Sequence, residues 1–100
     1  MAASYDKAFE NVIRLRVMSI LMVNESYDFN SFKELMDVTD GNLATHLRKL
    51  EEKGFINVNK SFIGRKPQTS YRVSKEGKKA FEAHLHFLEQ VSNEHKNNSN

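Results

Sequence analysis

The sequence predicts a mainly α-helical fold with a small β-hairpin, of the α+β class, in one domain. Apolar residues recur with helical spacing before Gly54 and again after Ser74. Between these segments, apolar and polar residues alternate in residues 56–59 and again in residues 69–73, with the period of two that is typical of a half-buried strand. The chain is therefore expected to place helices on either side of one antiparallel hairpin.

Composition restricts the range of functions. The chain has 100 residues, 39% hydrophobic and 28% charged, which suits one soluble domain without a separate catalytic or ligand-binding domain. It contains no cysteine, so a disulfide framework, a thiolate zinc site and a cysteine nucleophile are excluded. It shows neither a signal segment nor an apolar run long enough to cross a bilayer. We expect a cytoplasmic protein with no membrane partner.

The first predicted helix covers residues 4–23, which contain neither proline nor glycine. Its second half is apolar almost all round, whereas a surface helix of a monomer carries one apolar stripe. We therefore expect a second surface to cover it.

An extended connector, residues 27–29, leads to a short second helix. Asn30 or Ser31 is expected to cap this helix. Its expected buried face consists of Phe32, Leu35 and Met36, with Val38 packing the turn that follows.

Thr39 is expected to cap the third helix, which would run to Lys53. Asp40 in its first turn favours the positive end of the helix dipole. Gly54 supplies the left-handed residue that ends it.

The hairpin and a last helix complete the order. The connection between the strands, residues 63–68, contains Gly64 and the chain's only proline, and we expect a loop too long for a two-residue turn. Ser74 is expected to cap a helix that runs to about Val91. Residues 1–92 would form one domain for DNA binding and dimerisation, and residues 93–100 a disordered polar tail. This order of elements predicts a winged helix-turn-helix, with residues 62–69 as the wing.

The third helix has two distinct faces. Helical spacing places Leu43, Leu47 and Leu50 on one inward stripe. The outward residues are Gly41, Asn42, Thr45, Arg48, Lys49 and Glu52. A helix-turn-helix uses the N-terminal part of this helix to meet base edges in the major groove. Asn42 and Thr45 are therefore expected to read bases, and Arg48 and Lys49 to read guanine or neutralise phosphate. His46 lies at the border of the stripe, where packing or a phosphate contact is favoured over base readout.

Charge is concentrated in the middle of the chain. Residues 48–79 hold ten Lys/Arg and three Asp/Glu, whereas residues 1–47 hold four and seven, and residues 80–100 one and three. In the wing, Arg65 and Lys66 form a basic tip suited to a minor groove or to phosphates. The basic strip continues through Lys60, Arg72, Lys75, Lys78 and Lys79. This distribution favours a polyanionic partner.

The last helix carries two neighbouring apolar rows, of which one can cover its own domain and the other a partner. The residues expected to support a homodimer are Val12, Leu15, Phe81, His84, Leu85, Phe87, Leu88 and Val91. Two recognition helices would then match a pseudo-palindromic operator with half-sites about one DNA turn apart.

Other chemistry finds little support. Glu82, His86 and Glu89 have a spacing at which three side chains can converge on zinc. We expect them instead to form a solvent-exposed face of the helix. No phosphate-binding glycine loop, zinc-protease motif or catalytic triad is found. We expect no enzyme activity and no cofactor, and the sequence leaves open whether a small-molecule effector exists.

From Phe29 to Phe81 the chain resembles the small winged-helix transcriptional regulators of the MarR and ArsR types, especially a short stand-alone subgroup. The resemblance rests on residues 39–51, 54–56, 64–67 and 71–77. It implies a homodimer, base contacts from the helix containing Asn42 to Lys49, and wing contacts from Arg65. The cysteines often used by ArsR-type metal sensors are absent here, as are the extra helices of larger MarR-type proteins.

The sequence thus predicts a sequence-specific regulator of transcription, expected to be a repressor, that binds double-stranded DNA as a homodimer. Residues 40–53 would enter the major groove and residues 62–69 would lie on the minor groove or backbone. The alternative is the same fold used as a protein-interaction module without DNA binding.

Overall fold

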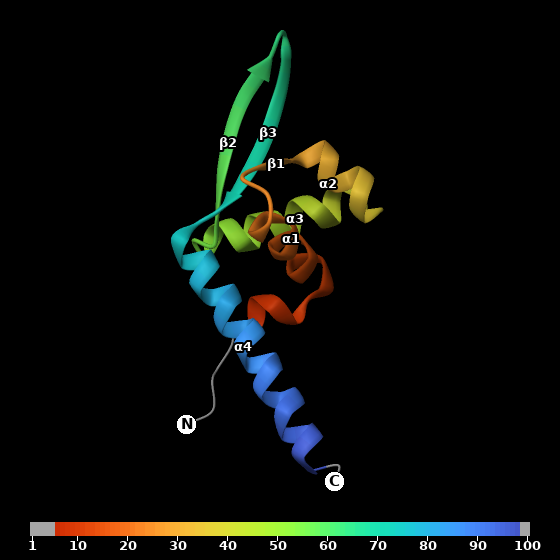
Figure 1. Ribbon diagram of the computed structural model, residues 1–100. Helices are drawn as coiled ribbons and strands as arrows, with labels where there is room; N and C mark the ends of the chain where they lie inside the picture. Colours follow the sequence, from red (N-terminus) through yellow and green to blue (C-terminus); the bar gives the residue numbers. More distant parts are fainter. Residues whose placement is uncertain (1–5, 99–100) are drawn as a thin grey trace.

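The computed structural model describes residues 6–98, and its element order is the predicted one (Figure 1). The elements are η1 (Lys7–Glu10), α1 (Val12–Met22), β1 (Tyr27–Asp28), α2 (Phe29–Met36), α3 (Asp40–Glu52), β2 (Ile56–Ile63), β3 (Lys66–Val73) and α4 (Lys75–Asn98). The strands form one antiparallel sheet in the order β1-β3-β2. The predicted fold class, mainly helical with a β-hairpin, is confirmed.

The prediction of one unbroken N-terminal helix is wrong, because two polar side chains divide it. Asp6 caps the short 3-10 helix η1. Asn11 then leaves helical geometry, with φ −93° and ψ 130°, and its side-chain oxygen accepts hydrogen bonds from the N–H groups of Ile13 and Arg14. Short polar side chains compete in this way with helical hydrogen bonding and favour helix starts. The predicted start at residue 4 lies outside the described residues.

The N-cap of α2 also differs from the prediction. Asp28, rather than Asn30 or Ser31, caps the helix, and its carboxylate accepts hydrogen bonds from the N–H and the hydroxyl of Ser31 at 3.1 and 2.6 Å. A carboxylate at this position also interacts favourably with the positive end of the helix dipole. The helix therefore begins at Phe29, directly after β1.

The buried face of α2 is narrower than predicted. Phe32 and Met36, four residues apart, are buried, whereas Leu35 is 55% exposed. A helix this short presents only one row to the core, and Leu35 lies beside that row. In the turn that follows, Asp37 has a left-handed φ of 53° and Val38 packs against the core as predicted.

The predicted ends and inward face of α3 are confirmed. The hydroxyl oxygen of Thr39 accepts a hydrogen bond from the N–H of Asn42 at 3.2 Å, and Gly54 ends the helix with φ 76°. The leucine stripe is buried, with exposed fractions of 0%, 2% and 0% for Leu43, Leu47 and Leu50.

The prediction of a long wing loop is wrong. The strands stay paired out to Ile63 and Lys66, which leaves Gly64 and Arg65 as a two-residue turn. A positive φ of 63° at Gly64, in the first turn position, is the pattern of a type II′ turn. Pro67 is tolerated within β3 because β1 pairs only with residues 70 and 71 of that strand. Next to Pro67, β3 has a free edge, so the nitrogen of Pro67, which lacks a hydrogen to donate, can face that edge without losing a hydrogen bond to a neighbouring strand.

One hydrophobic core lies between the helices and the inner face of the sheet. The ring of Phe9 stacks on Phe55 with centroids 5.6 Å apart and meets Phe81 edge-on at 5.4 Å. These aromatic contacts join η1, the residues after α3, and α4, and pairs of this kind add to the stability that burial provides.

The start of α4 is fixed against the end of α3. Ser74 caps α4 as predicted, its hydroxyl oxygen accepting from the N–H of Gly77 at 2.9 Å, and its own N–H donates to the carbonyl of Phe55 at 2.9 Å. A Cβ at position 77 would lie 2.0 Å from the same carbonyl oxygen, so only glycine permits this close approach.

The last helix is longer than predicted. It continues to Asn98 instead of ending near Val91, so residues 93–98, expected as a tail, are helical; residues 99 and 100 lie outside the described residues. In Figure 1 the distal half of α4 extends away from the body, in the direction opposite to the hairpin, and the molecule is 61 Å long. Within residues 6–98, no helix combines the length and the apolar character needed to span a membrane.

Candidate nucleic-acid interface

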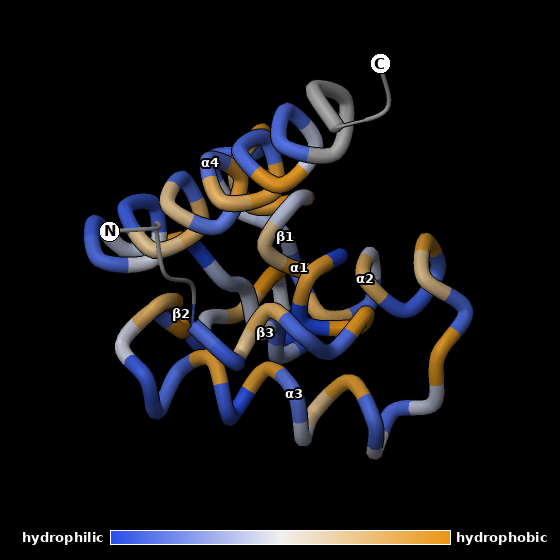
Figure 2. The backbone as a smooth tube through the Cα atoms, turned by 90° about the horizontal axis from the view of Figure 1, so that it is seen from below, coloured by the Kyte–Doolittle hydropathy of each residue, from blue (hydrophilic) through white to orange (hydrophobic). Residues whose placement is uncertain are grey.

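The polar face of α3 is open to solvent. With the leucine stripe turned inward, the predicted outward residues are all exposed: Gly41, Asn42, Thr45, Arg48, Lys49 and Glu52. Figure 2 shows α3 along one edge of the molecule, on the side away from α4. An exposed helix at the edge of the domain can approach a flat or grooved partner without obstruction.

The N-terminal turn of α3 is fixed from two directions. Besides the Thr39 cap, the Lys33 ammonium of α2 forms an ion pair with the Asp40 carboxylate at 2.8 Å and also donates to the carbonyl of Val38. These contacts hold the turn of the helix-turn-helix, and so the position of Asn42 at the start of α3, relative to α2.

His46 is anchored from α1. The guanidinium of Arg14 lies 2.9 Å from Nδ1 of His46. The Nε of the same arginine donates to the carbonyl of Ala8 at 2.7 Å. Burial lowers the pKa of His46, and the nearby charges of Arg14 and Lys49 lower it further. The imidazole is thus a half-buried, neutral link between two helices, at the border of the face as predicted.

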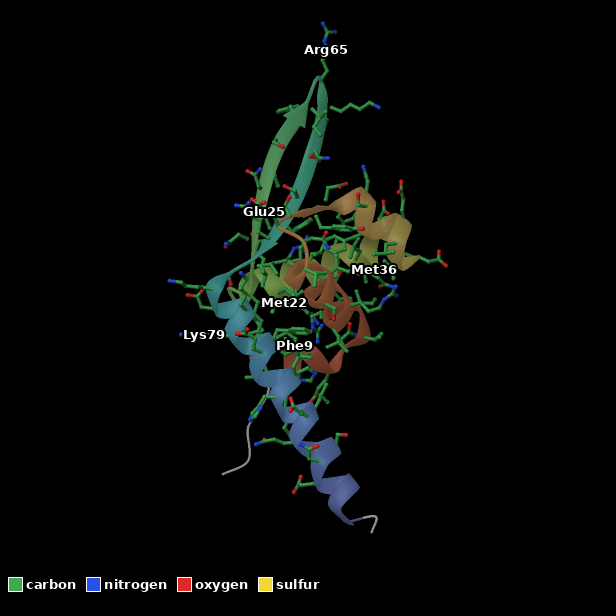
Figure 3. All side chains as sticks on the ribbon, in the orientation of Figure 1. Phe9, Met22, Glu25, Met36, Arg65 and Lys79 are labelled. Atoms are coloured by element: carbon green, nitrogen blue, oxygen red, sulfur yellow. The ribbon has the colours of Figure 1, made fainter. Side chains whose placement is uncertain are left out.

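The wing carries its basic residues at its end. Arg65 and Lys66 are exposed, and Figure 3 shows Arg65 at the far tip of the hairpin, pointing away from the body. The two-residue turn keeps the strands paired up to this point, so the tip is the paired end of a hairpin rather than a loop.

The recognition helix and the hairpin share one hollow. A cleft of about 330 Å³ lies between α3 and the sheet, and its polar lining includes Arg48 and Glu51 of α3 together with Lys60 and Thr69 of the hairpin. The outer face of α3 and the root of the wing therefore lie on the same side of the molecule. A polyanion lying along α3 would meet both.

The basic strip is only partly available. Lys60, Lys75, Lys78 and Lys79 are exposed, but the guanidinium of Arg72 forms an ion pair with Glu25 at 2.7 Å. On the other side, Lys53 at the end of α3 pairs with Asp6 at 2.8 Å. Cations already paired within the chain contribute less to binding a polyanion than free ones do.

The residues expected at a partner surface divide into two groups. Phe81 and His84 are buried within this chain, 3% and 6% exposed, and pack against Phe9. They belong to the core and cannot lie on a dimer surface. Leu15 and Phe87 are half-buried, and the exposed members are Val12, Leu85, Leu88 and Val91, each 44–63% exposed.

The possible metal ligands Glu82, His86 and Glu89 are exposed on α4. In the described part of the chain, no three His, Asp or Glu side chains are grouped as a metal site.

Two features were missed from the sequence. The link from Arg14 to His46 joins residues 32 positions apart, and no local pattern indicates it. Phe62 and Ile63, by contrast, are two consecutive apolar residues beside the turn, which a strict alternation would not place there; they are 72% and 62% exposed.

Comparison with known proteins identifies the family. A model described as a winged helix DNA-binding domain matches residues 13–92. The chain belongs to this family. An uncharacterized protein of Methanocaldococcus jannaschii is 37% identical over 86 residues, which cover 86% of this chain and 94% of that protein.

Solved structures share the fold of this winged-helix chain. The transcriptional regulator homologue protein from Pyrococcus horikoshii OT3 has a TM-score of 0.79 at 28% identity, covering 88% of this chain and 87% of that one. A MarR-family regulator of Enterococcus faecalis has a TM-score of 0.79 at 16% identity, covering 93% and 84%. PadR of Bacillus subtilis, solved with operator DNA, has a TM-score of 0.63 at 18% identity, covering 74% and 46%. An ArsR-family regulator also shares the fold, with a TM-score of 0.59 at 20% identity.

Proposed function

We propose that this winged-helix protein is a homodimeric regulator of transcription that binds double-stranded DNA sequence-specifically. The observation that carries the proposal is the shared hollow, in which Arg48 of α3 and Lys60 of the hairpin line the same cleft. The alternative, a module that binds another protein, does not account for a net excess of seven positive charges in residues 48–79.

In this proposal α3 enters the major groove. Asn42 and Thr45 lie exposed in its N-terminal half, where such helices meet base edges, and Asn can bond adenine in two places. Arg48 and Lys49 lie one turn further along and would contact guanine or phosphate. His46, with Nδ1 occupied by Arg14, has only its Nε2–H to offer a phosphate.

The wing would lie on the minor groove or the backbone. Arg65 at the tip and Lys66 beside it place two exposed cations at the end of the hairpin. Arginine is suited to the negative potential of a narrow minor groove. Operator DNA in the PadR structure, which shares this fold, supports duplex DNA as the partner.

We further propose that α4 makes the dimer contact. Leu85, Leu88 and Val91 recur every three residues along α4, and they are 47%, 46% and 44% exposed. Pairing this row with its copy would remove apolar surface from water and place two recognition helices for a pseudo-palindromic site. We propose that the dimer acts in the cytoplasm as a repressor, by occupying such a site.

Selection of bound fragments from random duplex DNA, followed by affinity titration against salt, tests the proposal. We expect a two-fold symmetric sequence with half-sites about one turn apart, bound with a steep linear fall of log affinity against log salt. Failure to enrich any sequence, together with binding that ignores salt, would favour the protein-interaction alternative.

A further inference from the structure

Phe62 and Ile63 expose apolar side chains near the tip of the wing. They are 72% and 62% exposed, close to the cationic residues Arg65 and Lys66 of the same hairpin. Both lie in β2, next to the turn, where the hairpin has left the body of the protein and nothing in the core requires them.

The register assigns the two residues to opposite faces of the hairpin. Successive side chains of a strand point to opposite faces, so Phe62 shares its face with Lys60 and Val58. Val58 and Lys60 line the hollow beside α3, and this face of the hairpin is therefore the one turned toward the recognition helix. Ile63 lies on the other face.

The opposite strand strengthens this arrangement. Pro67 pairs with Phe62 across the hairpin, and Thr69, two residues further along, lines the same hollow. Phe62 and Pro67 thus form an apolar pair on the α3 side of the wing. Ile63 pairs with Lys66 on the far side.

We propose that Phe62, backed by Pro67, packs into the minor groove of the DNA that α3 contacts. This inference rests on the proposed function and adds an apolar contact to it. Proteins that bind the minor groove frequently insert apolar side chains, phenylalanine and proline among them, between base steps from that groove. The neighbouring cations Lys60, Arg65 and Lys66 favour DNA over a second copy of the wing, since two wings together would bring like charges into contact.

A direct test uses the fact that the chain contains no tryptophan. Phe62→Trp introduces a single fluorophore on the α3 face of the wing, and Ile63→Trp places the matched control on the other face. On adding the selected duplex, we expect the emission of Phe62→Trp to be quenched or shifted while that of Ile63→Trp stays close to its value in the free protein. Equal responses of the two variants would overturn the proposal.

Affinity supplies a second measurement. Phe62→Ala is expected to bind the selected duplex about tenfold more weakly, because part of an aromatic side chain is no longer buried. The slope of log affinity against log salt should not change, since no cation is removed. Ile63→Ala should bind as the wild type does, and both variants should unfold at the wild-type temperature because neither side chain is in the core.

The results distinguish a failure of the role proposed for Phe62 from a failure of the proposed function. If the wild type binds DNA but both alanine variants bind equally well, the role of Phe62 is wrong and the proposed function stands. If no duplex binds the wild type, both are wrong. A tryptophan signal that depends on protein concentration without DNA would indicate contact between two wings instead.

Discussion

Arg14 of α1 and His46 of α3 are joined by a hydrogen bond of 2.9 Å between the guanidinium and Nδ1 of the imidazole. A guanidinium only donates, so Nδ1 accepts and the ring is neutral, with its proton on Nε2. The same arginine donates to the carbonyl of Ala8, and one side chain therefore connects η1, α1 and the recognition helix. Protonation of His46 would break this connection.

Stability is therefore expected to depend on the protonation of His46. Burial first, and then the charges of Arg14 and Lys49, place its pKa in the folded state below the ordinary value of 6.5. The unfolded chain then takes up the proton more readily, so this group destabilises the fold as pH drops through 6.5 and until the lower folded pKa is passed. Above that range the imidazole is neutral in both states and contributes no pH dependence.

Urea unfolding between about pH 7.5 and about pH 5.5 measures the effect. We expect the free energy of unfolding of the wild type to fall more steeply than that of His46→Gln, which keeps an acceptor for Arg14 but does not titrate. Parallel pH dependences of the two proteins would contradict the assignment.

Removal of single cations should reveal which of them contact phosphate. Arg65→Ala and Lys49→Ala are each expected to weaken duplex binding and to reduce the slope of log affinity against log salt by about one unit. Lys79→Ala tests the end of the basic strip on α4, which Figure 3 shows far from the wing tip, and it is expected to change the slope less than the other two variants. An unchanged slope for both test variants would count against these contacts.

The close approach at Gly77 predicts a large loss of stability. In Gly77→Ala the new methyl group would lie 2.0 Å from the carbonyl oxygen of Phe55, and the shift this forces should cost about 3 kcal/mol of the free energy of unfolding. Gly41→Ala is the control, since no heavy atom lies within 4 Å of its Cβ and helical alanine gains up to about 1 kcal/mol. Denaturant titration compares them, and similar stabilities would show that the contact relaxes easily.

The proposed dimer surface can be tested by adding charge to it. Leu88→Glu places a carboxylate in the exposed apolar row of α4 and should convert a dimer to a monomer in sedimentation at tens of micromolar. Ala83→Glu adds the same charge to an exposed position away from that row and should leave the dimer intact. A wild type that sediments only as a monomer would remove the dimer from the proposal.

The parts of the fold that depend on local patterns were predicted from the sequence. The leucine stripe of α3, the caps at Thr39 and Ser74, and the alternation in the hairpin each follow from short-range spacing, and the structure confirms them. They also place the polar face of α3 in solvent, which is most of the candidate site.

The errors have a common physical origin in competition between local signals. Asn11 lies within a segment whose apolar spacing indicates one continuous helix. Its side chain instead caps α1 and so divides the segment. Pro67 indicated a loop, yet the strand edge beside it is free of a partner. Whether an apolar residue faces the core or solvent, as for Leu35 and Phe62, depends on packing that no single segment determines.

The contacts of Ser74 and Gly77 with Phe55 make the end of α3 and the start of α4 one rigid corner. If two copies of α4 cross in the dimer, their crossing angle fixes how far apart, and at what inclination, the two base-reading helices stand. Substitutions near the distal end of α4 would then retune the preferred distance between half-sites while every base-contacting side chain stayed the same. Operator preference in this protein would be encoded in part at the end of the molecule farthest from the DNA.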